Sequence, residues 1–261
     1  GTGTGATLIS GAIGSNVTNV TENSSTSMLV LSSTSNAYTG TTTITSGTLQ
    51  LGAAGVIPNA SAVTITGTLD LAGNSETVGS IAGAGTITSS AAGTPVLTAG
   101  GNDTSTSFSG VIQNGSATSV ALVKAGTGTL TLGGASNSTY TGGTTIQAGT
   151  VQVSTNSAAL GTGGVTLGNT TGNSAASLLI GTSGLTVANA ITLATNASVG
   201  TLTIGTTGSI ATATYSGGVT GTNNFTIGNT TSSSLTFSTE AINNTGTITN
   251  SGTGTGATLI S

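Results

Sequence analysis

Residues 123–153 read VKAGTGTLTLGGASNSTYTGGTTIQAGTVQV, and this stretch decides the fold. Its apolar residues come in short runs that alternate with Thr or Gln, as in TLTL and TVQV. Gly, Asn and Ser end every run after a few residues, before a helix could begin. Alternation with a period of two is typical of strands that bury one face. The stretch therefore predicts short strands separated by tight turns.

The chain repeats itself on two length scales. Residues 37–51 read AYTGTTTITSGTLQL, which matches the TYTGGTTIQAGTVQV of residues 139–153 at an offset of 102 residues. Residues 1–10 and 252–261 both read GTGTGATLIS, at an offset of 251 residues. We expect residues 1–251 to be one tandem-repeat unit and residues 252–261 to start the next identical repeat of a longer polymer. Internal repetition of this kind favours a solenoid.

The composition excludes several functional classes. The chain has 261 residues, of which 34% are hydrophobic and 2% are charged, and it contains no His, Cys or Trp. One lysine cannot neutralise a run of phosphates, so no nucleic-acid partner is expected. The apolar runs are much shorter than the roughly 20 residues that a membrane-spanning helix needs. The hydrophobic fraction still suffices for a thin core of Val, Leu, Ile and Ala.

Short strands separated by turn residues could form either a sandwich or a solenoid. Exact repetition favours the solenoid, because each added coil buries its face against the last. The chain has only two prolines, Pro58 and Pro95, which suits internal strands that all donate ladder hydrogen bonds. No linker interrupts the pattern. We predict an all-β, right-handed parallel β-helix with about 12 coils per 251-residue repeat, since coils rise ~4.8 Å each and take roughly 20 residues.

Three segments resemble the passenger-associated transport repeat, also called the autotransporter-associated β-strand repeat, of bacterial surface proteins. They are residues 124–132 (KAGTGTLTL), 140–146 (YTGGTTI) and 149–152 (GTVQ). The earlier copy departs from this pattern, because residues 22–24 (ENS) stand in place of the Lys-x-Gly opening. The resemblance implies export across the outer membrane and a β-helical stalk at the extracellular bacterial surface. It also implies an outer-membrane translocator outside these 261 residues.

Few residues qualify as catalytic or metal-binding groups. Without His, only Lys124 and five scattered carboxylates could activate a nucleophile. Asp70 and Glu76 could pair as acid and base, or could simply keep a polar face solvated, in which case their deletion should leave the fold intact. Residues 100–103, GGND, could form a calcium turn or a plain turn with one acid. We favour the plain readings, and we assign no catalytic, cofactor-binding or metal-binding residue, no cofactor and no enzymatic activity.

Three further features have both a structural and a functional reading. Lys124 is interpreted as a solvent-facing lysine at a coil corner, with an amide crosslink to an Asn as the alternative. Tyr38 and Tyr140 are expected to cover the edge of the core, with stacking on a sugar as the alternative. The threonines of residues 41–43 and 144–145 could belong to an ice-binding face if they stacked in register over many coils. Interruptions by Asn, Ser and Gly argue against such rows.

The predicted function is a structural extracellular fibre or stalk that projects from bacterial cells or links them. Neighbouring repeats of the same chain, stacked end to end, are the expected partners; lateral bundling and contacts with glycans or other cell surfaces stay open. The first alternative is an adhesin passenger that binds a glycan or receptor through one solenoid face. Ice binding ranks behind it, and a surface-anchored hydrolase is disfavoured by the absence of His.

Overall fold

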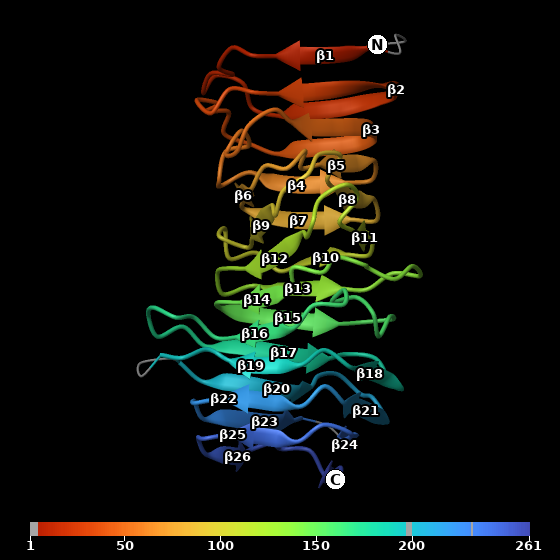
Figure 1. Ribbon diagram of the computed structural model, residues 1–261, viewed down its shortest axis with the longest axis vertical. Coiled ribbons are helices and arrows are strands. Elements are labelled where there is room, and N and C mark those ends of the chain that lie inside the picture. Colours follow the sequence, from red (N-terminus) through yellow and green to blue (C-terminus); the bar gives the residue numbers. More distant parts are fainter. Residues whose placement is uncertain (1–4, 197–199, 231) are drawn as a thin grey trace.

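A computed structural model describes residues 5–196, 200–230 and 232–261. These residues fold into a right-handed parallel β-solenoid of about 11 turns, built from strands and turns without a helix (Figure 1). The chain climbs steadily from the first turn to the last, so segments close in sequence also lie close along the axis. The predicted fold class is confirmed.

The described residues contain no helix that is long and apolar enough to span a membrane.

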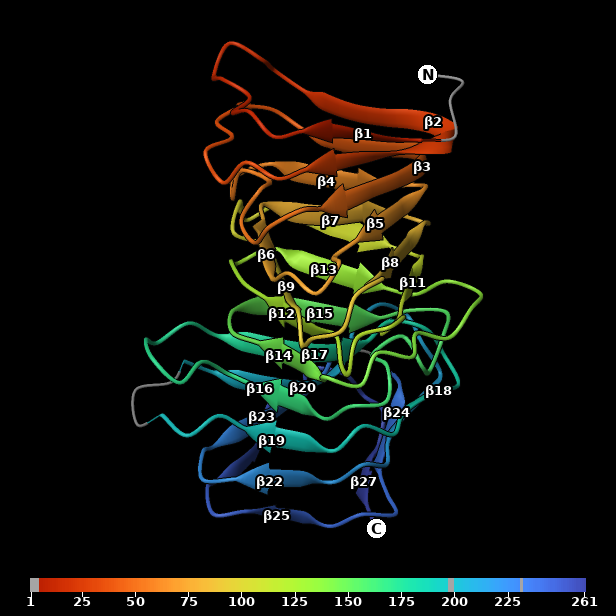
Figure 2. The same cartoon turned by 45° about the horizontal axis from the view of Figure 1, so that its top comes forward.

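Every turn passes three columns of stacked strands in the same order (Figures 1 and 2). Column 1 contains the first halves of β2 (Val20–Leu31) and β3 (Thr42–Leu51), then β4 (Ala62–Ile65), β7 (Ser80–Gly83), β10 (Thr106–Phe108), β13 (Thr129–Leu132), β15 (Gly149–Val153), β17 (Ala176–Ile180), β20 (Leu202–Thr206), β23 (Phe225–Asn229) and β26 (Ile248–Asn250).

Column 2 follows column 1 in each turn. It contains β1 (Ala6–Ile9), the second halves of β2 and β3, β5 (Thr68–Asp70), β8 (Thr86–Thr88) and β11 (Val111–Ile112), and later in the chain β18 (Leu185–Val187), β21 (Thr212–Tyr215), β24 (Ser234–Phe237) and β27 (Thr258–Ile260). Column 3 closes the turn with β6 (Glu76–Val78), β9 (Val96–Ala99), β12 (Ala121–Lys124), β14 (Thr144–Ile146), β16 (Val165–Leu167), β19 (Ile191–Leu193), β22 (Val219–Gly221) and β25 (Ile242–Asn244).

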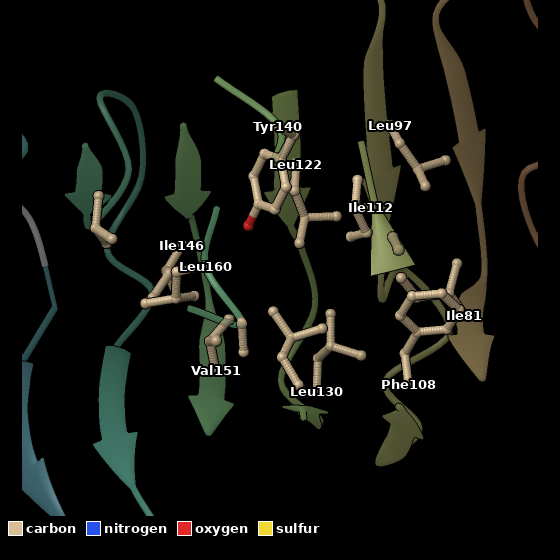
Figure 3. Close-up of a cluster of buried hydrophobic side chains, with 14 of the residues drawn as sticks. Ile81, Leu97, Phe108, Ile112, Leu122, Leu130, Tyr140, Ile146, Val151 and Leu160 are labelled. Carbon is tan, nitrogen blue, oxygen red and sulfur yellow. The ribbon is translucent and has the colours of Figure 1, made fainter. Parts of the chain in front are cut away.

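The in-register parallel pairing stacks like on like and creates a slim aliphatic core. Leu130 pairs with Val151, Val151 with Leu178, and Leu178 with Ile204, and all four side chains are buried. Alternate residues of the same strands point outward, which is why the outward positions are mostly Thr. Figure 3 shows Leu122 of column 3 and Leu130 of column 1 in the same buried cluster.

The expected number of about 12 coils is one too many, because the turns are longer than assumed. Ladder partners in adjacent turns are 18 residues apart at the shortest, from Ile65 to Gly83, and 27 at the longest, from Val153 to Ile180. In two turns a loop, residues 133–143 or 154–164, replaces the column 2 strand. About 11 turns therefore use about 23 residues each.

Candidate functional site

The only lysine of the chain lies inside the solenoid. In β12, Leu122 and Lys124 occupy the inward positions, and Lys124 is only 1% exposed. Its Nζ donates to the carbonyl oxygens of Ala125 (2.6 Å), Gly126 (2.8 Å) and Ala148 (3.3 Å). The expected solvent-facing lysine is wrong, because strand alternation points the side chain inward and corner carbonyls satisfy it. Burial lowers its pKa to about 8, against the raising influence of the Asp103 carboxylate.

The two tyrosines of the repeated text are buried, as expected for residues that cover the core. Tyr140 is fully buried, and its hydroxyl lies 2.6 Å from Oγ1 of Thr144. Tyr38 repeats this contact with Thr42 at 2.7 Å, and Thr42 also contacts Oγ of Ser61 at 3.0 Å. Burial raises the pKa of both phenols above the usual value. Neither ring is available to stack on a sugar.

Asp70 is buried and connects three successive turns. Its carboxylate accepts from Gln50 Nε2 (2.8 Å) in the turn before, from Ser90 N (2.8 Å) in the turn after, and from Ala72 N (2.9 Å). Burial alone would raise its pKa, but these hydrogen bonds outweigh burial and lower it. Asp70 does not keep a polar face solvated, and we now expect its removal to cost stability.

Glu76 is also buried, at 2% exposure, and fixes the backbone of the neighbouring turn. Its carboxylate accepts from the backbone N–H groups of Val56 (2.9 Å), Ile57 (3.3 Å) and Thr77 (3.0 Å). Burial raises its pKa despite these donors. Asp70 and Glu76 share none of these partners, so the arrangement gives each carboxylate a separate structural role rather than an acid–base pair.

The GGND turn uses its polar groups on its own neighbours. Asp103, in the left-handed conformation at φ 61°, is exposed and accepts from the backbone N (2.6 Å) and Oγ1 (3.1 Å) of Thr127 in the next turn. Asn102 Nδ2 donates to Ser80 Oγ at 3.2 Å. In the part of the chain that the structure describes, no three His, Cys, Asp or Glu residues are grouped so as to hold a metal ion.

Threonines stack in register, but from different turns rather than from the runs in the sequence. Thr42 and Thr144 point inward and are buried. Register aligns one outward column over six turns of column 1: Thr129, Thr150, Ser177, Thr203, Thr226 and Thr249. The adjoining outward column contains Gln152, Leu179 and Gly205, so a second parallel hydroxyl row does not form beside the first.

Comparison with protein families found one family model, described as passenger-associated-transport-repeat, that matches residues 24–51 and 122–153. The chain carries passenger-associated-transport-repeats. This confirms the resemblance drawn from the sequence. Comparisons with curated proteins and with solved structures gave no match.

The two passenger-associated-transport-repeats have one local structure on different sides of the solenoid. Each places strand, corner and strand in two successive turns, with a buried tyrosine ahead of the second turn. In the first repeat the Tyr38 segment leads into column 1, whereas in the second the Tyr140 segment leads into β14 of column 3. An offset of 102 residues is therefore not a whole number of turns, and the repeat is not tied to one face.

The register also shows which residue replaces the lysine in the first passenger-associated-transport-repeat. Lys124 is the ladder partner of Ile146, and Glu22 is the partner of the equivalent Ile44. A register shift between Glu22 and Met28 accommodates one extra residue in the corner. The same inward position thus holds opposite charges in the two repeats, which an alignment of the two texts without the register does not reveal.

Thr206 and Asn229 form a buried polar pair that the sequence reading missed. They are ladder partners, Thr206 Oγ1 donates to Asn229 Oδ1 (3.0 Å), and Asn229 Nδ2 donates to the Ser233 carbonyl (2.7 Å). The available signal was alternation, because each residue stands two positions after an inward Ile in LTIGT and FTIGN.

Proposed function

We propose that this chain is a rigid, non-catalytic segment of an extracellular fibre or stalk at a bacterial surface. The repeats and the β-solenoid fold support an autotransporter passenger-like protein. The observation that carries the finer proposal is the parallel ladder that continues from turn to turn through the described residues. A secreted, surface-exposed location follows from the same family and is part of the proposal.

The ladder suits a stalk because its hydrogen bonds run along the long axis. Each internal strand is bonded to the turn before and the turn after, in up to three columns, so bending must disturb several ladders at once. Only 2% of residues are charged, so stacked turns place few like charges above one another. The buried Lys124, Asp70 and Glu76 are bonded to backbone groups of neighbouring turns, which fixes the corners.

A glycan array probed with the purified 261-residue chain separates a stalk from an adhesin. A stalk gives no specific signal on the array. Saturable binding to one glycan class, lost on substitution of outward residues of a single column, would favour the adhesin. Protease treatment of intact producing cells tests the location, since a surface chain is removed and an internal one survives.

Ice binding keeps one supporting observation, the outward hydroxyl column from Thr129 to Thr249. A single row offers a narrow contact, and Leu179 and Gly205 occupy the adjoining outward positions. Thermal hysteresis of concentrated protein is the assay, and we expect none. A hysteresis that disappears when Thr203 and Thr226 are replaced by Lys would establish the alternative.

A further inference from the structure

The two copies of GTGTGATLIS occupy equivalent places in the solenoid. Residues 1–4 of the first copy lie outside the described residues, but Ala6–Ile9 form β1 and Thr258–Ile260 form β27. Strand β1 pairs in parallel with the second half of β2, and β27 pairs in parallel with β24. Both strands belong to column 2. The 251-residue offset therefore spans a whole number of turns, about 11.

The inward and outward directions also agree between the two places. At the first, Thr7 and Ile9 are partners of the buried Leu29 and Leu31. At the last, the identical Thr258 and Ile260 are partners of the buried residues Leu235 and Phe237.

The Leu between them lies opposite an outward-facing residue in both places. It is Leu8 beside Val30 in β1, and Leu259 beside Thr236 in β27. A whole number of turns without this agreement would invert the strand, so the two observations are independent.

The two strands use opposite edges. In the described chain β1 is paired only towards the turn that follows, and β27 only towards the turn that precedes. Each therefore leaves free the edge that the other has paired. One strand with this sequence can be paired on both edges at once, which removes two open sheet edges.

Both ends of the solenoid expose the interior. A hollow of about 630 Å³ opens at the first turn beside Ile9, Ile13 and Leu29, and one of about 380 Å³ at the last beside Phe237, Ile242 and Ile260. The large hydrophobic residues exposed among the described residues all lie in these end turns: Leu8, Val17, Ile248, Leu259 and Ile260. Apolar surface of this kind is usually covered by a partner.

We propose that copies of the 251-residue sequence join end to end in phase, with one GTGTGATLIS segment serving as the last strand of one copy and the first strand of the next. The partner of each end is thus a second copy of this chain, in the same polypeptide. This deepens the proposed stalk by naming its axial partner. Because the segment keeps its column and its facing, the joined copies form one straight column without a kink.

The test is a polypeptide with residues 1–251 followed by residues 1–261, so that the segment occurs once at the junction. The chain contains no Cys, so Thr192→Cys in both copies provides two specific sites for spin labels at an exposed outward position. We expect a narrow distance distribution centred on about 11 rungs of ~4.8 Å, roughly 53 Å. A broad distribution or a clearly different centre would overturn the proposal, whereas a glycan-array result bears only on the stalk function.

A matched pair of junction variants tests the shared strand itself. Aspartate in place of the inward Ile9 at the junction should broaden the distribution, because it places an unpaired charge in the core. Aspartate in place of the outward Leu8 should leave the distance unchanged. Equal effects of the two variants, or none from either, would show that the segment does not pack as a common strand.

Discussion

Lys124 Nζ lies 3.3 Å from the carbonyl oxygen of Ala148, which belongs to the next turn of the solenoid. The same amine donates to the carbonyls of Ala125 and Gly126 at its own corner. One buried ammonium therefore holds two corners of adjacent turns together.

Lys124→Met should destabilise the chain although Met fills a similar volume. The substitution removes the donor for three carbonyl oxygens, and a buried unsatisfied acceptor costs about 1 to 3 kcal/mol. We expect a loss of at least about 2 kcal/mol, measured as a lower urea midpoint by circular dichroism. Val123→Thr, at the adjacent outward position, is the control and should change little. An unchanged midpoint for Lys124→Met would refute the structural role.

The stability of the chain should rise with pH between about 8 and 10 because of the same residue. Burial lowers the pKa of Lys124 from its ordinary 10.5 to about 8, so its contribution to stability is present above 10.5 and is lost as pH falls through about 8. The urea midpoint of the unmodified chain should therefore increase over this range, and that of Lys124→Met should not. Parallel profiles for the two proteins would contradict the assignment.

Above pH 10 the tyrosines should reverse the trend. Burial raises the pKa of Tyr140 and Tyr215 above the ordinary value of 10.0. Their contribution is present below pH 10 and is lost as pH rises through the folded values, because the unfolded chain releases its phenolic protons first. We expect the midpoint to fall at higher pH, with no tyrosinate absorbance until the fold is lost.

Asp70→Asn should destabilise the chain at neutral pH but not in acid. Hydrogen bonds from Gln50, Ser90 and Ala72 outweigh burial and lower the pKa of Asp70, so its contribution is present above 3.8 and is lost as pH falls through the folded value. We expect a cost of about 1 to 3 kcal/mol at pH 7, as for hydrogen bonds to a charged group, and a shrinking difference below pH 3.8. Glu240→Gln, at an exposed position, is the control. A cost that does not depend on pH would show that the carboxylate charge is unimportant.

Tyr140→Phe should cost more than Tyr38→Phe, although the two tyrosines occupy the same motif. Loss of the Tyr140 hydroxyl removes the contact to Thr144, whereas Thr42 keeps Ser61 as a second partner. We expect about 1 to 3 kcal/mol for Tyr140→Phe and less for Tyr38→Phe. Adding Thr144→Val to Tyr140→Phe should recover part of the loss, because it removes the unpaired hydroxyl. Equal costs for the two tyrosines would contradict this account.

Gly149→Ala should be far more harmful than Gly101→Ala. Gly149 has φ 67°, and a Cβ there would meet the carbonyl oxygens of Gly126 and Gly128 at 2.5 Å. The left-handed conformation alone costs a residue with a side chain about 1 to 2 kcal/mol. Nothing lies within 4 Å of a Cβ at Gly101. Thermal unfolding of the two variants is the comparison, and a similar loss in both would contradict the described corner.

Alternation and repetition were sufficient to predict the fold class, the two repeats and the burial of Tyr38 and Tyr140. They did not predict the direction of Lys124, although alternation within ALVK places it inward together with Leu122. Charged residues are rarely buried without a partner, and here the partners are corner carbonyls, which have no signature in the sequence. For the same reason Asp70 was read as solvated.

The number of turns and the threonine column depend on register, which local sequence does not fix. Ladder partners lie 18 to 27 residues apart, according to how much chain each loop takes outside the columns. Thr150 and Ser177 are stacked because the loop between them has the required length, not because a repeat in the text aligns them.

The central claim is that successive turns stack in one continuous parallel column, and one distance tests it most directly. Thr77 and Thr220 lie in the same outward column of column 3, six turns apart, through Thr98, Val123, Thr145, Thr166 and Thr192. Spin labels on Thr77→Cys and Thr220→Cys in the 261-residue chain should give a narrow distribution near six rungs of ~4.8 Å, roughly 29 Å. A broad distribution, or a separation far from this value, would contradict the solenoid.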